Sequence, residues 1–458
     1  MDRGSSEKRT PKKQPTTPTE VYLPGRSRAL EEDEELVMDK AAYRFYYQLH
    51  VEAPSLSFDV LLDCLGENRP VEVDGDPVTA YIVAGTQTAH EKPNNLIVMK
   101  LSNMKPMTKK ETTTKEDEDS SDSDSDSEED LDSQPELDSA KIPHNGTINR
   151  VRSHQFNGVY LTATWSELGE VNVWDLSRPL SAVNDSVIMS EYVRTREAPS
   201  PIFTFRGHQT EGYALAWSPL AASQGYLATG DLAGAIHIWQ PRPTGWTVSK
   251  PYSGHEGSVE DIQWSPTEAT VFLSASTDRS LRVWDTRSPT AKNAAMITLP
   301  EAHQLDVNVI SWNRIQPVSV VSGADDGCIR VWDLRMVSQQ RKSAGDQLTA
   351  FTHSFDYHRA AITSVEWHPT EAGIFVATSE DDQTTLWDIT LEQEAAANMD
   401  TDEGETDATN DPSEVPVQLL FIHTGQQEVK EAHWHPQIPG LVINTAADGF
   451  NLFRTICV

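Results

Sequence analysis

The sequence has few cysteines and lacks long apolar runs. Its three cysteines, Cys64, Cys328 and Cys457, lie far apart, and none belongs to a CxxC pair. Such a sparse, odd-numbered set argues against a disulfide framework and is typical of an intracellular protein. No apolar stretch approaches the roughly 18 residues of a membrane span. The first residues are polar and contain no apolar segment of a secretory signal. We therefore predict neither a membrane protein nor a secreted one.

Signatures of catalysis are also missing. The sequence contains no GxxxxGK[ST], GxSxG or HExxH motif, and no glycine-rich loop between a strand and a helix. His433 and His435 stand two residues apart, but Trp434–Pro436 repeats a Trp-x-Pro pattern that occurs at three other places. A strand is therefore the favoured interpretation of this segment, and a metal site is the alternative. We predict a protein that is not an enzyme and has no cofactor or metal.

Basic residues are scarce relative to acidic ones. The chain has 37 Lys and Arg against 70 Asp and Glu, which gives a net charge of −33. Three windows without Lys or Arg hold 27 of the acidic residues, at 31–35, 116–138 and 392–414. Such blocks repel themselves and cannot bury enough apolar surface to fold. We expect disordered acidic inserts at about 105–140 and 391–415. An acidic surface favours basic protein partners over direct contact with nucleic acid.

The second acidic window contains candidate phosphorylation sites. Four serines have an acidic residue three positions later, as acidophilic kinases require: Ser121, Ser123, Ser125 and Ser127. Each phosphate would add about −1.5 to −2 charges. An unmodified solubilising spacer is the alternative.

A repeated unit organises most of the chain. Residues 254–285 begin with Gly-His, end with Trp-Asp and contain three short β-branched or aromatic runs separated by turn formers. Histidines 154, 208, 255, 303, 358 and 423 are each followed by an aromatic residue, at a distance of 29 or 30 residues in four cases. A period of roughly 40–50 residues with these ends is typical of a β-propeller blade.

Six such units and a degenerate first one predict an all-β, seven-bladed WD-repeat propeller over residues 54–458. The chain stops after the third strand of the last unit, and a propeller removes its sheet edges by closing. The missing strand must then come from the N-terminal side. The candidates are Val21–Leu23 and the residues just before Pro54.

The residues before the propeller divide into two parts. Residues 1–34 are expected to be a disordered arm, in which Lys8-Arg9 and Lys12-Lys13 could form a nuclear import signal. Residues 35–53 are expected to contain a helix, because Asp39 can cap it and apolar residues follow at helical spacing. The helix either packs on the propeller wall or helps to line a groove for a partner helix.

Three units contain the histidine, aspartate and tryptophan that can form a hydrogen-bonded chain across a blade, because a buried imidazole and a buried indole N–H each need a partner. These residues are interpreted as structural, and the other units as lacking a full set. The sets are His255, Asp278 and Trp284; His303, Asp326 and Trp332; and His358, Asp381 and Trp387.

Function is therefore expected in the surfaces of the propeller. The loops before the first strand of each blade lie around one mouth of the channel. They carry, or lie beside, Glu211, Tyr213, Glu260, Asp261, Asn308 and Glu431. Carboxylates with an aromatic and an amide suit a peptide rich in Lys and Arg. A solvated acidic rim is the alternative.

Several segments resemble the histone-binding branch of the WD-repeat family, and within it a ribosome-assembly subgroup. These segments are GHQTEGYALAWSP at 207–219, SVEDIQWSP at 258–266, DVNVISW at 306–312, WDTRS at 284–288, GTINRVR at 146–152 and the FRTICV end. The subgroup's acidic tract is rich in Glu, whereas this one is rich in Asp and Ser.

This resemblance implies a nucleolar chaperone that acts as a monomer on a basic large-subunit ribosomal protein, number three, and that also binds core histones. It implies that Tyr43, Phe45 and Tyr46 contact a histone helix, and that Glu211, Tyr213, Glu260 and Asn308 contact a basic tail. A histone chaperone linked to replication licensing is the alternative. A ubiquitin-ligase substrate receptor is a third hypothesis, because WDTR and WDLR occur at 284–287 and 332–335.

Overall fold

The computed structural model describes residues 21–24, 26–28, 31, 34–72, 75–88, 93–107, 134–288, 295–340, 351–391 and 415–458. The two N-terminal basic pairs, the four candidate phosphorylation sites and most of the acidic inserts lie outside these residues. The chain divides into two compact units, 1–39 with 406–414 and 40–405 with 415–458. Within the described residues, no helix has the length and apolar character that a membrane crossing requires.

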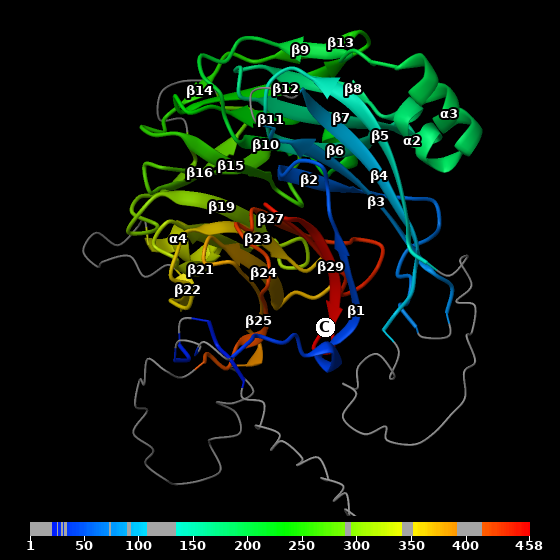
Figure 1. The fold of residues 1–458 in the computed structure, drawn as a ribbon. Helices are drawn as coiled ribbons and strands as arrows, with labels where there is room; N and C mark the ends of the chain where they lie inside the picture. The colour runs from blue at the N-terminus through cyan, green and yellow to red at the C-terminus, as the bar shows by residue number, and fades with distance from the viewer. Residues whose placement is uncertain are drawn as a thin grey trace, which may run out of the picture. The chain divides into compact units, whose positions relative to one another are not determined.

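Seven antiparallel sheets of the second unit form the blades of a β-propeller, which confirms the predicted fold class (Figure 1). Blade one contains β2 (Ser55–Leu61), β3 (Val78–Thr86), β4 (Asn94–Met104) and β5 (Glu136–His144). Blade two contains β6 (Ile148–Phe156), β7 (Val159–Ser166), β8 (Val171–Asp175) and β9 (Phe203–Phe205). Blade three contains β10 (Ala214–Trp217), β11 (Leu227–Gly230), β12 (Ala235–Arg242) and β13 (Gly245–Val248), with β14 (Tyr252–Ser253) also paired to β12.

The remaining four blades follow the same strand order. Blade four contains β15 (Val259–Trp264), β16 (Val271–Ser276), β17 (Leu281–Asp285) and β18 (Ile297–Leu299). Blade five contains β19 (Val307–Trp312), β20 (Ser319–Ala324), β21 (Ile329–Asp333) and β22 (Phe351–Phe355). Blade six contains β23 (Ile362–Trp367), β24 (Ile374–Ser379), β25 (Gln383–Asp388) and β26 (Leu419–His423). Blade seven contains β27 (Glu431–Trp434), β28 (Val442–Ala446), β29 (Gly449–Thr455) and β1 (Tyr43–Leu49).

The outer strand of blade seven closes the propeller. Strand β1 pairs antiparallel with β29, with Tyr46 opposite Phe453, and Figure 1 shows the two strands side by side. The closing strand therefore comes from the N-terminal side, as predicted, but from neither of the two candidate segments. Because β29 would otherwise present an open edge of unpaired backbone groups, this pairing protects the sheet from aggregation.

The prediction of a helix within residues 35–53 was wrong. One short turn of 3-10 helix, η1 (Lys40–Ala42), leads directly into β1. Tyr43 and Phe45 are both buried with Arg44 exposed between them, which is the alternation of a strand. Aromatic residues favour strands, and the pairing partner lies about 400 residues away in the sequence, where a local pattern cannot reveal it.

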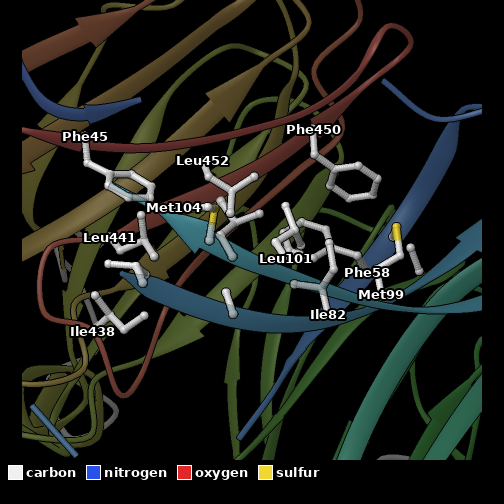
Figure 2. Close-up of a cluster of buried hydrophobic side chains, with 14 of the residues drawn as sticks. Phe45, Phe58, Ile82, Met99, Leu101, Met104, Ile438, Leu441, Phe450 and Leu452 are labelled. Atoms are coloured by element: carbon white, nitrogen blue, oxygen red, sulfur yellow. The ribbon is translucent and has the colours of Figure 1, made fainter. Parts of the chain in front are cut away.

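Apolar side chains fill the space between neighbouring blades. Between blades seven and one, a cluster contains Phe45 of β1, Phe450 and Leu452 of β29, and Phe58 and Ile82 of blade one (Figure 2). All five side chains are fully buried. The closing strand thus contributes to the core as well as to the backbone ladder, so the N-terminal and C-terminal ends of the propeller stabilise each other.

A pair of helices interrupts blade two between β8 and β9. They are α2 (Ser177–Asn184) and α3 (Ser186–Thr195), and Asp185 caps the second by accepting backbone N–H groups of Val187 and Ile188. Helix α2 contacts β4 and β5 of blade one. The sequence did not predict this pair. The other described helical segments are η3 (Ala221–Ser223) and α4 (Leu334–Gln340).

Candidate functional site

Seven strands, the first of each blade, surround the channel. Strands β2, β6, β10, β15, β19, β23 and β27 each contact the first strand of the next blade, and β27 contacts β2. In five of these strands the register shifts at the start, which releases the second residue from the ladder and re-aims its side chain. We call the following group the channel mouth: Asn149, Glu211, Tyr213, Glu260, Asp306, Asn308 and Asp325.

The channel mouth contains all four residues that were predicted for it from the sequence. The side-chain amide of Asn149 donates to Glu211 at 2.9 Å, and that of Asn308 donates to Asp325 at 2.7 Å. Tyr213 is half-buried, and burial together with the charges of Glu211 and Glu260 raises the pKa of its phenol. These residues come from blades two to five and belong to one electrostatic neighbourhood.

The carboxylates of the channel mouth crowd one another. Burial raises the pKa of Glu260, and the nearby charges of Asp306 and Asp325 add to this effect. Burial also raises the pKa of Asp306, again with a contribution from Asp325. Repulsion among like charges disfavours the ionised forms, and a cation placed among them would relieve it. Asp306 and Asp325 were not predicted from the sequence, although both lie beside residues of the expected rim.

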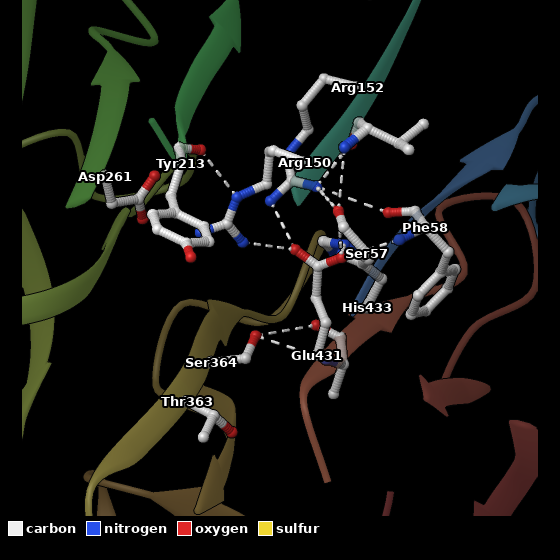
Figure 3. A network of polar contacts seen from close by, with 12 residues as sticks. Ser57, Phe58, Arg150, Arg152, Tyr213, Asp261, Thr363, Ser364, Glu431 and His433 are labelled. Atoms are coloured by element: carbon white, nitrogen blue, oxygen red, sulfur yellow. Dashed lines mark hydrogen bonds and ion pairs between the residues drawn. The ribbon is translucent and has the colours of Figure 1, made fainter. Parts of the chain in front are cut away.

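Below the mouth, a buried ionic cluster joins the first strands of three blades (Figure 3). Glu431 of β27 is 1% exposed and accepts from Arg150 at 2.8 Å and Arg152 at 2.7 Å, both on β6. It also accepts from the Ser57 hydroxyl at 2.8 Å and the Phe58 backbone N–H at 2.9 Å, both on β2. Glu431 therefore ties blade seven to blades one and two.

The charges of this cluster shift one another's protonation. Burial would raise the pKa of Glu431, but Arg152, His433 and Arg150 hold it well below its usual range. Burial would lower the pKa of His433, but Glu366 at 2.6 Å and Glu431 at 3.6 Å raise it to about 10. His433 is therefore protonated at neutral pH, and the cluster holds three cations around its carboxylates.

Two carboxylates that were predicted at the rim are structural instead. Glu431 is the centre of the buried cluster, and Asp261 is 7% exposed and accepts the backbone N–H groups of Ile262 and Ile310. Burial raises the pKa of Asp261. Both side chains satisfy groups of the scaffold, so neither is open to a partner in the way that Glu260 is.

The three residues expected to contact a histone helix lie on β1 and not on a helix. Phe45 is fully buried in the core between blades seven and one. Tyr43 is 7% exposed, and its hydroxyl lies 2.8 Å from Nδ1 of His423. Tyr46 is half-buried, and burial raises the pKa of its phenol. Their described contacts close the propeller, and residues 43–49 form a strand in place of the helix on which the expected groove depended.

The three predicted structural sets lie within their blades, each with a Ser or Thr hydroxyl between histidine and tryptophan. In blade four, His255 lies 2.9 Å from Asp278 and 2.6 Å from Ser274, to which Trp284 donates at 2.8 Å. In blade five, Ser322 joins His303 to Trp332, and Asp326 is 3.5 Å from the histidine. In blade six, Thr385 joins His358 to Trp387, and Asp381 is 3.0 Å from the histidine.

Two further blades have histidine chains that were not assigned from the sequence. In blade three, His208 bonds to Asp231 at 2.9 Å and to Thr229 at 2.8 Å, and Trp239 donates to the same threonine. In blade two, His144 and not His154 reaches Trp174, through Thr164. The interpretation of both blades as lacking a full polar network was therefore wrong for blade three and incomplete for blade two.

One group of metal-ligand side chains occurs among the described residues. His303, Asp326 and Cys328 place their donor atoms within 4.8 Å of one another. His303 and Asp326 already belong to the hydrogen-bonded set of blade five, and Asp326 accepts the backbone N–H groups of Gln304 and Cys328. The group thus fits a scaffold role without an ion.

Comparisons with known proteins agree with the repeat architecture. The family model for the histone-binding protein RBBP4, or the corresponding component of the CAF1 complex, matches residues 33–105. The model described as "WD domain, G-beta repeat" matches residues 246–285, 296–333 and 349–388.

Three relatives match nearly the whole chain. Protein HEAT STRESS TOLERANT DWD 1 of Arabidopsis thaliana is 43% identical over 96% of this chain and 92% of its own length. Ribosome assembly protein rrb1 of Schizosaccharomyces pombe is 39% identical over 95% of this chain and 84% of its own. Glutamate-rich WD repeat-containing protein 1 of Dictyostelium discoideum is 40% identical over 93% of this chain and 83% of its own.

Proposed function

The chain belongs to the family of WD-repeat proteins that includes these three relatives, and from this premise we propose that it is a non-catalytic binding protein of ribosome assembly. Its client would be a basic large-subunit ribosomal protein, number three, which it would shield in the nucleolus before assembly. The observation that carries this proposal is the channel mouth, where partly buried carboxylates repel one another and lack enough cations of their own.

The mouth suits a basic segment for a physical reason. Arg150 is the cation nearest to Glu260, but its guanidinium is already engaged by Glu431 and by the backbone carbonyl of Tyr213. An incoming Lys or Arg would therefore meet carboxylates that remain under-compensated, and Tyr213 would offer it an aromatic face. The acidic windows at 116–138 and 392–414 would add long-range attraction for the same client.

Histone binding is the second candidate function. It is favoured by the match of residues 33–105 to the histone-binding family model. Core histones are basic, so the same mouth would serve them. Because residues 43–49 form the closing strand and not a helix, the mouth is the surface that we assign to histones as well.

A third candidate is a substrate receptor of a ubiquitin ligase. The arginines of the WDTR and WDLR motifs, Arg287 and Arg335, have 72% and 68% of their side chains exposed. Each is oriented by a 2.6 Å ion pair with the aspartate two residues before it. Pre-oriented, exposed guanidinium groups suit a protein partner, but they explain neither the acidic windows nor the channel mouth.

One experiment separates these candidates. Tagged protein is purified from cells with and without residues 116–138, and its partners are quantified by mass spectrometry at several salt concentrations. We expect ribosomal protein number three to be enriched in both forms, with weaker retention of the deletion at high salt. Enrichment of histones without any ribosomal protein, or of ligase components alone, would overturn the proposal.

A further inference from the structure

Exposed leucines accompany the acidic residues of the channel mouth. Leu168 is 54% exposed, Leu232 is 37% exposed and Leu305 is 51% exposed. Leu168 lies in the turn between β7 and β8, Leu232 in the turn between β11 and β12, and Leu305 in the loop before β19. In each case the connection lies at the end of the blade where the first strands begin. A purely ionic site for a basic segment would have no use for apolar side chains there.

Two of these leucines flank Glu211 on opposite sides. The backbone N–H of Leu232 donates to the carbonyl of Glu211 at 3.0 Å. The turn that carries Leu168 approaches the residue before Glu211, since a β-carbon added at Gly169 would lie 3.4 Å from the Thr210 carbonyl oxygen. Leu168, Glu211 and Leu232 therefore form one continuous piece of surface, which extends to Tyr213 two residues further along the chain.

The third leucine lies beside the other carboxylates of the mouth. Leu305 directly precedes Asp306, whose backbone carbonyl accepts from the N–H of Asp325 at 3.0 Å. Single exposed leucines are ordinary on protein surfaces. Here, however, three of them alternate with carboxylates around one opening, and such a combination marks an interaction surface.

We propose that the channel mouth binds an amphipathic basic segment, in which apolar side chains alternate with Lys or Arg, in preference to an uninterrupted basic tract. This inference rests on the proposed function and specifies the client sequence that the site prefers. The cationic side chains would meet Glu211, Glu260 and Asp306, while the apolar ones would cover Leu168 and Leu232. Burial of apolar surface then selects among basic segments that charge alone cannot distinguish.

The test uses two synthetic peptides of equal length and charge, one repeating Lys-Leu-Lys-Ser and the other repeating Lys-Ser-Lys-Ser. Their affinities for the full chain are measured by fluorescence anisotropy at low and physiological salt. We expect the leucine-containing peptide to bind about tenfold more tightly, because it buries apolar surface that the other cannot. This ratio should persist as salt rises, while both affinities fall.

Variants locate the effect on the protein. The double variant Leu168→Ser/Leu232→Ser should bind both peptides equally, and Ile315→Ser is the matched control. Ile315 is 50% exposed but lies in the connection after β19, at the opposite end of the blade. Thermal melting checks that the variants remain folded, and the peptide comparison on the unmodified protein needs no variant.

The outcomes separate this inference from the proposed function. If the unmodified protein binds both peptides equally, and Glu260→Gln weakens both, the mouth binds basic segments but the apolar preference is wrong. If neither peptide binds, or if Glu260→Gln changes nothing, the proposed use of the mouth fails and the inference fails with it.

Discussion

Replacement of Glu431 by Gln tests whether the buried cluster holds the propeller together. The substitution keeps the size and one oxygen acceptor of the side chain but removes its charge. Arg150 and Arg152 would then lose the carboxylate that both contact at less than 3 Å, within a site where Glu431 is 1% exposed. Removal of one partner from a buried ion pair costs about 3–5 kcal/mol, because the remaining charges are left uncompensated.

The predicted loss is large enough to measure directly. Urea unfolding followed by tryptophan fluorescence should show a midpoint lowered by roughly 1 M, since this loss is divided by a slope that grows with chain size. Glu371→Gln serves as the control, because Glu371 is exposed and has no described ion pair. It should change stability by less than about 0.5 kcal/mol. A Glu431→Gln midpoint equal to that of this control would refute the structural role of the cluster.

Three further predictions concern the ionic cluster and the closure of the propeller. The pKa of His433 is raised to about 10, so its stabilising contribution is present below the ordinary value of about 6.5 and is lost as pH rises through 10; His433→Gln should lower stability at pH 7 and flatten the fall in melting temperature above it. Gly449 has φ +125° and a β-carbon there would lie 2.2 Å from the Leu49 carbonyl oxygen, so Gly449→Ala should cost about 2 kcal/mol or more and lower the melting temperature. Tyr43→Phe removes the hydroxyl that contacts His423 and should cost about 1 kcal/mol by the same measurement; an unchanged melting temperature in either variant would contradict the account of closure.

The repeat architecture could be predicted because each blade repeats its own local pattern. Gly-His starts, Trp-Asp ends and turn formers recur at similar spacing, and they led to seven blades. One signal was available but misused. His154 stands 20 residues before Trp174, whereas His144 stands 30 before it, in line with the other units. The regular spacing would have identified His144 as the structural histidine of blade two.

What could not be predicted depends on contacts between distant segments. Residues 43–49 have some helical spacing, but pairing with β29 and packing against blade one override that weak local preference. Glu431 looked like a rim carboxylate because Arg150 and Arg152 lie about 280 residues away in the sequence. The channel-face residues Glu211, Tyr213, Glu260 and Asn308 were placed together correctly, since each stands at the same point of its repeat.

The central claim is that the channel mouth binds a basic client, and the most direct test is the affinity of purified ribosomal protein number three for two forms of this chain. The forms are the unmodified protein and Glu260→Lys/Asp306→Lys, which reverses two charges of the mouth without touching the buried cluster. Isothermal titration at physiological salt should show at least tenfold weaker binding of the variant. Equal affinity for a variant whose melting temperature is unchanged would contradict the account.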